Sequence, residues 1–370
     1  MKAQDVGVWC VPCRGPADLS GVQALAEAGE LDPRDIVAVM GKTEGNGCVN
    51  DHTRDFATMA WQHYLSSHLQ CTPAEVEARV SLVMSGGTEG VLSPHFTVIT
   101  RRFIVGAPAA DDKRLVVGVA QTRTFLPEEI GRRAQIEATA EAVRGAMRDA
   151  GIEDPADVHF VQIKCPLLTS DRMADAAGRG AAPVTQDTYA SMGFSRGASA
   201  LGVAVALGEL PADTVHDGLV LADGAPWSGR ASVSAGIELE NNVVIVLGEA
   251  AGAVSAFRIG HAVMKDAVDA QSVRTMFRES FGLDPERDAD EVARRLVNLL
   301  AKAEASPDGR VRGARHTMLN DSDINATRHA RAAVGGVLGA LVGRTRLYVS
   351  GGAEHQGPPG GGPVAAILHI

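Results

Sequence analysis

The sequence predicts an α/β protein made of three structurally similar α+β domains, arranged with internal pseudo-threefold symmetry around one central site. Three segments of the chain end alike, in the pattern V-x(0–1)-S-[GA]-G-x-E, and their serines are Ser85, Ser234 and Ser350. The copies lie much farther apart than the roughly 20–50 residues that separate the repeats of a solenoid. The repeated unit is therefore expected to be a whole domain.

A lysine closes an apolar run earlier in each unit. The runs IVAVMGK and VHFVQIK end at Lys42 and Lys164 and are typical of strands, whereas VARRLVNLLAK, which ends at Lys302, looks helical. We expect each unit to contain a strand, an amphipathic helix, a strand ending at lysine, a loop, a helix that begins with arginine, and a strand ending at serine.

An arginine opens a stretch rich in small residues in each unit, at Arg54, Arg196 and, in the third unit, Arg331. Arg328 is the alternative in the third unit because, like the other two, it follows a hydroxyl residue. Arg331 is preferred because it precedes the glycine at the end of its helix by the same distance as Arg196 does. The two candidates share a helix face, so both can approach one site.

The segment EEIGRRAQIEATAEAVRGAMRDAG shows the predicted helix type most clearly, with apolar residues at helical spacing and Gly151 as its stop. Irregular stretches mark the domain boundaries: FIVGAPAADDKR follows the first unit and GEAAGAVSA follows the second. The predicted domains are residues 1–104, 111–251 and 255–370.

Composition narrows the classes of partner. The 370 residues are 45% apolar and carry a formal net charge of −10, without the basic stripe that contact with nucleic acid requires. The apolar stretches are too short to span a membrane. The five cysteines form no disulfide framework, which favours a reducing, cytoplasmic setting. Cys10 and Cys13 have the spacing of a redox or zinc pair, but no second pair accompanies them, so we interpret them as structural thiols.

Three copies of lysine, arginine and Ser-Gly-Gly around one centre would bind a planar, oxygen-rich ligand of near-threefold symmetry. Each arginine offers a fork of donors, and each serine offers a hydroxyl together with the backbone N–H groups that follow it. The substrate-binding set predicted in this way is Arg54, Ser85, Gly86, Arg196, Ser234, Ala235, Arg331, Ser350 and Gly351. The alternative is that the glycines form ordinary turns and the cations lie on solvated faces.

Several motifs resemble the cyanuric acid hydrolase and barbiturase family along essentially the whole chain, among them VMGKTEGNGCVND, VMSGGTEGVLSPH, MGFSRGASALG, SAGIELENNVV and SGGAEHQGPPGGGP. The resemblance implies a three-domain fold, a homotetramer and ring-opening hydrolysis of cyanuric acid, a cyclic imide, to carboxybiuret, which loses CO2 to give biuret. The match is closer to the cyanuric acid branch. Barbituric acid remains the alternative substrate.

A serine nucleophile needs a base, and a buried lysine whose pKa falls toward roughly 7–8 can supply it. Lys42 and Lys302 are followed two residues later by glutamates, and a nearby carboxylate would keep a lysine charged. Lys164 is followed by Cys-Pro instead, which leaves it as the candidate base. The family resemblance likewise implies Lys164 as base and Ser234 as nucleophile, with the other serines polarising carbonyls. Ser232 is the local competitor for the nucleophile.

The glycine- and proline-rich segment AEHQGPPGGGP near the C-terminus is either a rigid turn or an oxygen cage for Mg²⁺ or Ca²⁺. The family resemblance implies a structural divalent cation held by Glu304, Ala353, Gln356, Gly357, Pro358 and Gly361. No cofactor is expected to take part in catalysis.

Two functions other than hydrolysis use some of the same residues. Met40-Gly41-Lys42-Thr43 is similar to the end of a nucleotide-binding loop, but Ile36 occupies the position where that loop needs glycine. A non-catalytic ring-binding protein, with all three lysines protonated, would use the same residues as the enzyme. Consumption of cyanuric acid distinguishes the two.

Overall fold

The computed structural model describes residues 2–106 and 112–370, which form three four-stranded sheets and one two-stranded hairpin. The first sheet has the order β1-β4-β2-β3. Its strands are β1 (Lys2–Pro12), β2 (Ile36–Thr43), β3 (Ser81–Gly86) and β4 (His95–Val105), and its helices are α1 (Ser20–Glu27), α2 (His52–Leu69) and α3 (Pro73–Arg79).

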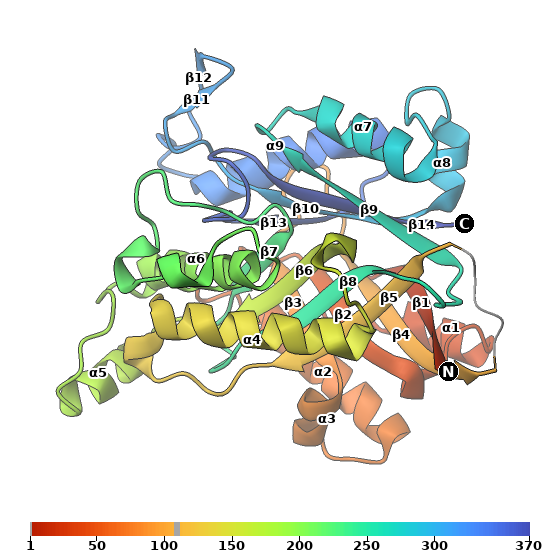
Figure 1. Cartoon of the computed structure of the whole chain (residues 1–370), viewed down its shortest axis with the longest axis horizontal. Coiled ribbons are helices and arrows are strands. Elements are labelled where there is room, and N and C mark those ends of the chain that lie inside the picture. Colours follow the sequence, from red (N-terminus) through yellow and green to blue (C-terminus); the bar gives the residue numbers. More distant parts are fainter. Residues whose placement is uncertain (1, 107–111) are drawn as a thin grey trace.

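The second sheet repeats this topology in the order β5-β8-β6-β7. It contains β5 (Arg114–Gln121), β6 (Val158–Cys165), β7 (Ala231–Ala235) and β8 (Val243–Ala250), with the helices α4 (Arg133–Ala150), α5 (Ser170–Gly178) and α6 (Thr188–Ala206). Figure 1 shows α4 and α6 side by side on the outside of this sheet. The predicted stop of α4 is confirmed, because Gly151 caps the helix in the left-handed conformation.

The third sheet has the order β9-β14-β10-β13, again the same topology. Its strands are β9 (Phe257–Met264), β10 (Leu296–Ala303), β13 (Tyr348–Gly351) and β14 (Gly362–His369), and its helices are α7 (Ala270–Phe281), α8 (Ala289–Arg295) and α9 (Ala326–Val342). The hairpin of β11 (Arg310–Val311) and β12 (Ala314–Arg315) projects from this part of the molecule (Figure 1).

The helical reading of VARRLVNLLAK is wrong over its second half. The segment is split between α8 and β10, so Lys302 stands near the end of a strand, as Lys42 and Lys164 do. Tertiary pairing of β10 with two neighbouring strands overrides the local helical pattern. This correction makes the three units more alike than the sequence suggested.

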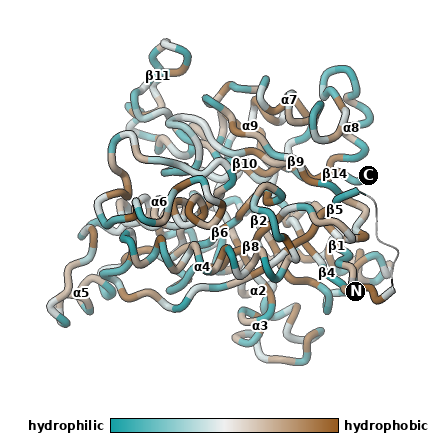
Figure 2. The backbone as a smooth tube through the Cα atoms, viewed as in Figure 1, coloured by the Kyte–Doolittle hydropathy of each residue, from teal (hydrophilic) through white to brown (hydrophobic). Residues whose placement is uncertain are grey.

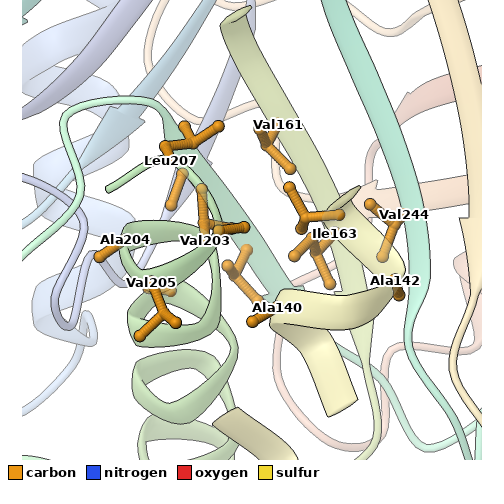
Figure 3. Packing of buried hydrophobic residues seen from close by; sticks show 14 of the residues in the cluster. Ala140, Ala142, Val161, Ile163, Val203, Ala204, Val205, Leu207 and Val244 are labelled. Carbon is orange, nitrogen blue, oxygen red and sulfur yellow. The ribbon is translucent and has the colours of Figure 1, made fainter. Parts of the chain in front are cut away.

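Each sheet is apolar on both faces. One buried cluster combines residues of all three sheets at the centre of the molecule, among them Met40, Phe160 and Leu300. On its other face each sheet packs against its own helices. Figure 3 shows this outer packing in the second unit, where Val203 of α6 and Ala140 of α4 face Val161 and Ile163 of β6.

Hydropathy along the backbone agrees with this layering. Figure 2 shows hydrophobic stretches concentrated on the strands in the interior and hydrophilic residues toward the periphery. Within the described residues, no helix combines the length and the apolar character needed to cross a membrane. The division into domains 1–104, 111–251 and 255–370 stays a prediction; its starting points at residues 1 and 111 lie outside the described residues.

Candidate active site

Each lysine lies directly beside its serine on a pair of parallel strands. Lys42 is the register partner of Ser85, Lys164 of Ser234, and Lys302 of Ser350. Side chains alternate along a strand, and the residues two positions earlier, such as Met40 and Leu300, belong to the central cluster. The same alternation turns all three lysines and all three serines toward the centre of the molecule.

The three serine hydroxyls meet where the three sheets converge. Ser234 Oγ lies 2.9 Å from Ser350 Oγ, and Ser85 Oγ donates to Ser350 Oγ at 3.3 Å. They line a narrow cavity whose atom-free space, together with the solvent at its mouth, is about 280 Å³. Only a small ligand can therefore bind between the three serines.

The cavity brings together every residue of the predicted binding set. It is lined by Gly47, Arg54, Ser85, Gly86, Lys164, Met192, Arg196, Ser234, Ala235, Arg331, Ser350 and Gly351. Of the three repeat lysines, all described, only Lys164 is part of this lining. Arg331, the arginine preferred in the third unit, lines the cavity, and Arg328 does not. Ser232 lies deeper and donates to Gln162 Oε1 at 2.8 Å, so it is separated from the cavity.

Sequence reasoning missed Gly47 and Met192. Gly47 adopts a left-handed conformation, with φ +69°, in the loop before α2, which brings its backbone close to the Arg331 guanidinium. Met192 lies one helical turn before Arg196 on α6 and shares its face. The four-residue spacing to a predicted site arginine is the signal that could have found Met192.

Lys42 and Lys302 lie behind the cavity and contact their own serines. Lys42 Nζ donates to Ser85 Oγ at 3.4 Å, and Lys302 Nζ donates to Ser350 Oγ at 3.3 Å and to Val233 O at 2.8 Å. Burial, with a further contribution from neighbouring arginines, lowers the pKa of both lysines well below the ordinary value. Both amines therefore lose their proton more readily than an exposed lysine does.

Lys164 has a different environment, which overturns one argument from the sequence. Its Nζ lies 3.1 Å from Glu238 Oε1 and donates to Met84 O at 2.7 Å. Burial lowers the pKa of Lys164, but Glu238 opposes this shift. The lysine predicted to lack a carboxylate is thus the one that has it.

The glutamates that follow the other two lysines make no ion pair with them among the described residues. Residues two apart on a strand share a face, but each glutamate lies just beyond the end of its strand, where the chain has already turned. Glu44 is exposed, and Glu304 accepts a hydrogen bond from Gly360 N at 3.0 Å. Sequence spacing therefore did not predict side-chain direction here.

The arginines connect the three units in a cycle. Arg331 Nε donates to Glu89 Oε2 and Arg196 Nε donates to Glu354 Oε2, both at 2.7 Å, and each pair has a second, parallel hydrogen bond through Nη2. Arg54 instead donates to backbone carbonyls, including Ala235 O at 3.2 Å.

Three glutamates around the cavity were visible in the sequence without an assigned role. Glu89, Glu238 and Glu354 are the final residue of the repeated pattern V-x(0–1)-S-[GA]-G-x-E. Their constant distance from the serine was the available signal. The structure shows that they hold the cations around the cavity.

The backbone N–H groups after the serines are less available than expected. The amides of Gly87, Gly236 and Gly352 donate to the carbonyls of Thr43, Cys165 and Ala303 at the ends of the neighbouring strands. The second N–H of each Ser-Gly-Gly or Ser-Ala-Gly turn is thus engaged in holding the turn. The predicted anion nest of consecutive N–H groups is therefore not formed by these turns.

The C-terminal loop fits a cation at its backbone rather than through the side chain of Gln356. Gln356 Oε1 accepts from Val233 N at 2.6 Å, so only its backbone carbonyl is available to a metal. Glu304 is largely buried beside the loop, makes no ion pair among the described residues, and burial raises its pKa. A buried carboxylate without a cationic partner, next to a turn of backbone oxygens, is compatible with Mg²⁺ or Ca²⁺.

Cys10 and Cys13 have the properties of structural thiols. Burial raises the pKa of Cys10 to about 11 and that of Cys13 to about 12, so both stay protonated and weakly nucleophilic. Within residues 2–106 and 112–370, no cluster of three or more histidine, cysteine, aspartate or glutamate side chains forms a candidate metal site.

Comparison with known proteins finds relatives along the whole chain. The cyanuric acid amidohydrolase of Bradyrhizobium diazoefficiens is 58% identical over 372 residues, covering 100% of each chain, and that of Pseudomonas sp. strain ADP is 59% identical, covering 98% of each. A solved structure described as "Cyanuric acid hydrolase: evolutionary innovation by structural concatenation" superposes with a TM-score of 0.95 at 57% identity and covers 100% of both chains. The sequence profile of the amidohydrolase ring-opening proteins matches residues 7–369. The chain therefore belongs to the family of amidohydrolase ring-opening proteins.

Proposed function

We propose that the protein is a cyclic amide hydrolase that opens the ring of cyanuric acid to carboxybiuret, which then loses CO2 to give biuret. The observation that carries this proposal is the convergence of three serines and three arginines, from three sheets of one topology, on a single cavity. Cyanuric acid is a planar ring with three carbonyl oxygens in threefold arrangement. The cavity and the ring therefore match in symmetry and in hydrogen-bonding groups.

Ser234 and Lys164 are the proposed nucleophile and base. Lys164 lines the cavity, whereas the other two repeat lysines lie behind it, and Ser234 is the most exposed of the three serines at 7%. Lys164 accepts the Ser234 proton as Oγ attacks a ring carbonyl, and then protonates the leaving ring nitrogen. Water hydrolyses the resulting acyl-enzyme in the reverse sequence of proton transfers.

The oxyanion of the tetrahedral intermediate needs donors close to Ser234. The Ser350 hydroxyl, 2.9 Å from Ser234 Oγ, and the neighbouring arginines supply them, since the Gly236 amide is already engaged. The hydroxyls of Ser85 and Ser350 polarise carbonyls in this scheme and do not attack them.

Single serine variants test the assignment. Ser234→Ala should lower kcat by at least roughly 10³-fold while retaining ligand binding, because it removes the nucleophile. Ser85→Ala and Ser350→Ala should lower kcat by roughly 10²-fold, the usual effect of one lost transition-state donor. Equal residual turnover in all three variants would sink the single-nucleophile scheme. Absence of cyanuric acid consumption by the wild-type protein would favour a ring-binding protein.

Barbituric acid is the second candidate substrate, because it differs from cyanuric acid at one ring position and presents the same three oxygens. The relative from Azorhizobium caulinodans, 49% identical, carries the broader name cyclic amide hydrolase. Turnover of the two rings under identical conditions decides between them. We expect cyanuric acid to be the better substrate because only it is threefold symmetric.

A structural divalent cation is proposed at Glu304 with the backbone oxygens of Ala353, Gln356, Gly357, Pro358 and Gly361. When bound there, the cation would neutralise the buried Glu304 carboxylate and tie down the loop that holds β7 through the bond from Val233 N to Gln356 Oε1. Chelation should lower the melting temperature of the wild-type protein and change that of Glu304→Gln much less. An equal response of both proteins to the chelator would contradict this assignment.

A cytoplasmic homotetramer completes the proposal. The five free cysteines support a reducing compartment, and consecutive exposed apolar residues at the end of β4, Phe103–Val105, support burial in an assembly. Sedimentation equilibrium tests the tetramer directly. A monomer at micromolar concentration would contradict it.

A further inference from the structure

The state of each repeat lysine correlates with the partner of the glutamate in the same unit. Glu89 and Glu354 are each held by an arginine from another unit, and the lysines of their units, Lys42 and Lys302, donate to their own serines. Glu238 is held by Lys164 instead. Lys164 correspondingly makes no hydrogen bond to Ser234 among the described residues. The second unit, which is the one proposed to act, thus differs from the other two in the contacts of its lysine.

Two orphaned atoms mark the missing contact. Arg54 Nε and Glu238 Oε2 are both buried and have no hydrogen-bond partner among the described residues. Arg54 lies close enough to be one of the charges that lower the pKa of Glu238. In the other two units, Nε of the arginine is the atom that donates to the glutamate. Arg54 Nε and Glu238 Oε2 are therefore the donor and the acceptor that a third arginine–glutamate pair would use.

The backbone also has two conformations among the three copies of this turn. Gly87 and Gly352 have φ of +107° and +77°, where the adjacent space is filled by an arginine guanidinium. Gly236, the equivalent residue, has no such left-handed φ. The Glu238 carboxylate occupies the space that a side chain at Gly236 would fill. Glycine adopts both conformations at little cost, so the turn at Gly236 can pass from one to the other.

We propose that Glu238 is a positioning residue that exchanges partners, leaving Lys164 for Arg54 when the ring binds. The proposal rests on the function proposed above, in which Lys164 is the base. Ring oxygens arriving beside Ser234 repel the Glu238 carboxylate, and Arg54 receives it in the geometry that Arg196 and Arg331 already show. Lys164 is then free to reach Ser234.

The exchange changes the protonation of Lys164 as well as its position. The charged or titratable groups that face Lys164 are Glu238, Arg54 and Cys165, and Glu238 is the one that stabilises the ammonium most. Burial raises the pKa of the Cys165 thiol, so it stays neutral. Once Glu238 has moved, burial and Arg54 favour the neutral amine, and Lys164 releases one proton to water before it acts as base.

Proton release on ligand binding tests the exchange without turnover. Calorimetric titration of Ser234→Ala with cyanuric acid, in buffers of different ionisation enthalpy, counts the protons released. The Ser234→Ala, Glu238→Gln double variant should release up to one proton fewer, because without the Glu238 carboxylate Lys164 holds its proton less tightly before the ligand arrives. Equal release from both proteins would overturn the exchange.

The pH dependence of turnover gives a second, independent readout. The acidic limb of kcat/KM reports the free enzyme, so Glu238→Gln should move it to lower pH by about 1–3 units, the effect of one close charge. Glu89→Gln, which breaks an arginine pair elsewhere in the cycle, should raise KM and leave this limb in place. A limb that does not move in Glu238→Gln would reduce Glu238 to a packing role. Failure of the wild-type protein to turn over any ring would instead remove the proposed function.

Discussion

At the scale of single residues, the buried lysines show most clearly how burial changes the pKa of a side chain. Lys42 is fully buried, its pKa is well below the ordinary value, and it contacts the face of the Tyr348 ring. A base with a lowered folded-state pKa binds fewer protons in the folded state than in the unfolded state. The free energy of unfolding therefore falls as the pH drops below the ordinary lysine pKa of about 10.5.

Replacing Lys42 by methionine should therefore stabilise the fold. We expect Lys42→Met to raise the free energy of unfolding by about 1–3 kcal/mol at pH 7, because an incompletely paired buried amine is removed. The gain should shrink toward pH 9.5, where less proton release accompanies folding. Urea denaturation at both values measures it.

Lys113→Met is the matched control for this prediction. Lys113 is an exposed lysine whose Nζ lies 2.6 Å from Asp157 Oδ1, and this hydrogen bond raises its pKa. Its removal should cost stability rather than add it. A loss of stability in both variants would contradict the lowered pKa of Lys42.

Residue identities alone were enough to predict which serines and arginines meet, but not how the charged groups pair. The repeat in the sequence named Ser85, Ser234 and Ser350 and all three arginines, because domains of one topology place equivalent strand ends at one centre. The contact between Lys164 and Glu238 could not be predicted, since it depends on the direction of a side chain beyond a strand end. The carboxylate argument failed for that physical reason.

At the scale of elements, the turns after β3, β7 and β13 show best what the sequence could and could not predict. The sequence predicted strands that end at each serine, while the conformational difference between Gly236 and its two equivalents has no sequence signal. The segment before Lys302 did have a sequence signal, but the signal was ambiguous. Its helical pattern led to a wrong prediction because an amphipathic run can also pair as a buried strand.

Gly87→Ala tests the close packing of one turn. A Cβ there would lie 2.5 Å from Arg331 Nε, in addition to the strain of a left-handed residue with a side chain. We expect a loss of about 2–3 kcal/mol in the free energy of unfolding and a higher KM, because Arg331 is displaced from the cavity. Gly29→Ala, with φ +72° and no atom within 4 Å of the added Cβ, should cost only about 1 kcal/mol and leave KM unchanged. Identical effects of the two substitutions would contradict the contact.

At the scale of the whole molecule, the three sheets are bound together by the central cluster and by the cations that cross between units. Lys164 reaches Met84 O in the first unit, and Lys302 reaches Val233 O in the second. Removing one unit would expose the apolar inner faces of the other two. The three units are therefore expected to unfold together.

A single cooperative transition in urea is the corresponding prediction. The three tryptophans belong to the first two units, as Trp9, Trp61 and Trp227, whereas circular dichroism follows the helices of all three. Both signals should change at the same urea concentration, as a two-state transition requires. A fluorescence transition that clearly precedes the loss of helix would show that the units are energetically independent.

The convergence of three serines on one point also affects how often binding succeeds. A ring with three identical edges can enter such a cavity in three rotational orientations that present the same atoms to Ser234. Under the proposed scheme each of these three orientations is productive, although Ser234 is the one nucleophile. A ring with one altered edge loses this degeneracy, because some of its orientations place the wrong atom at the serine. Internal repetition of the chain thus gives a symmetric ring more productive binding orientations than an asymmetric one, before any bond is broken.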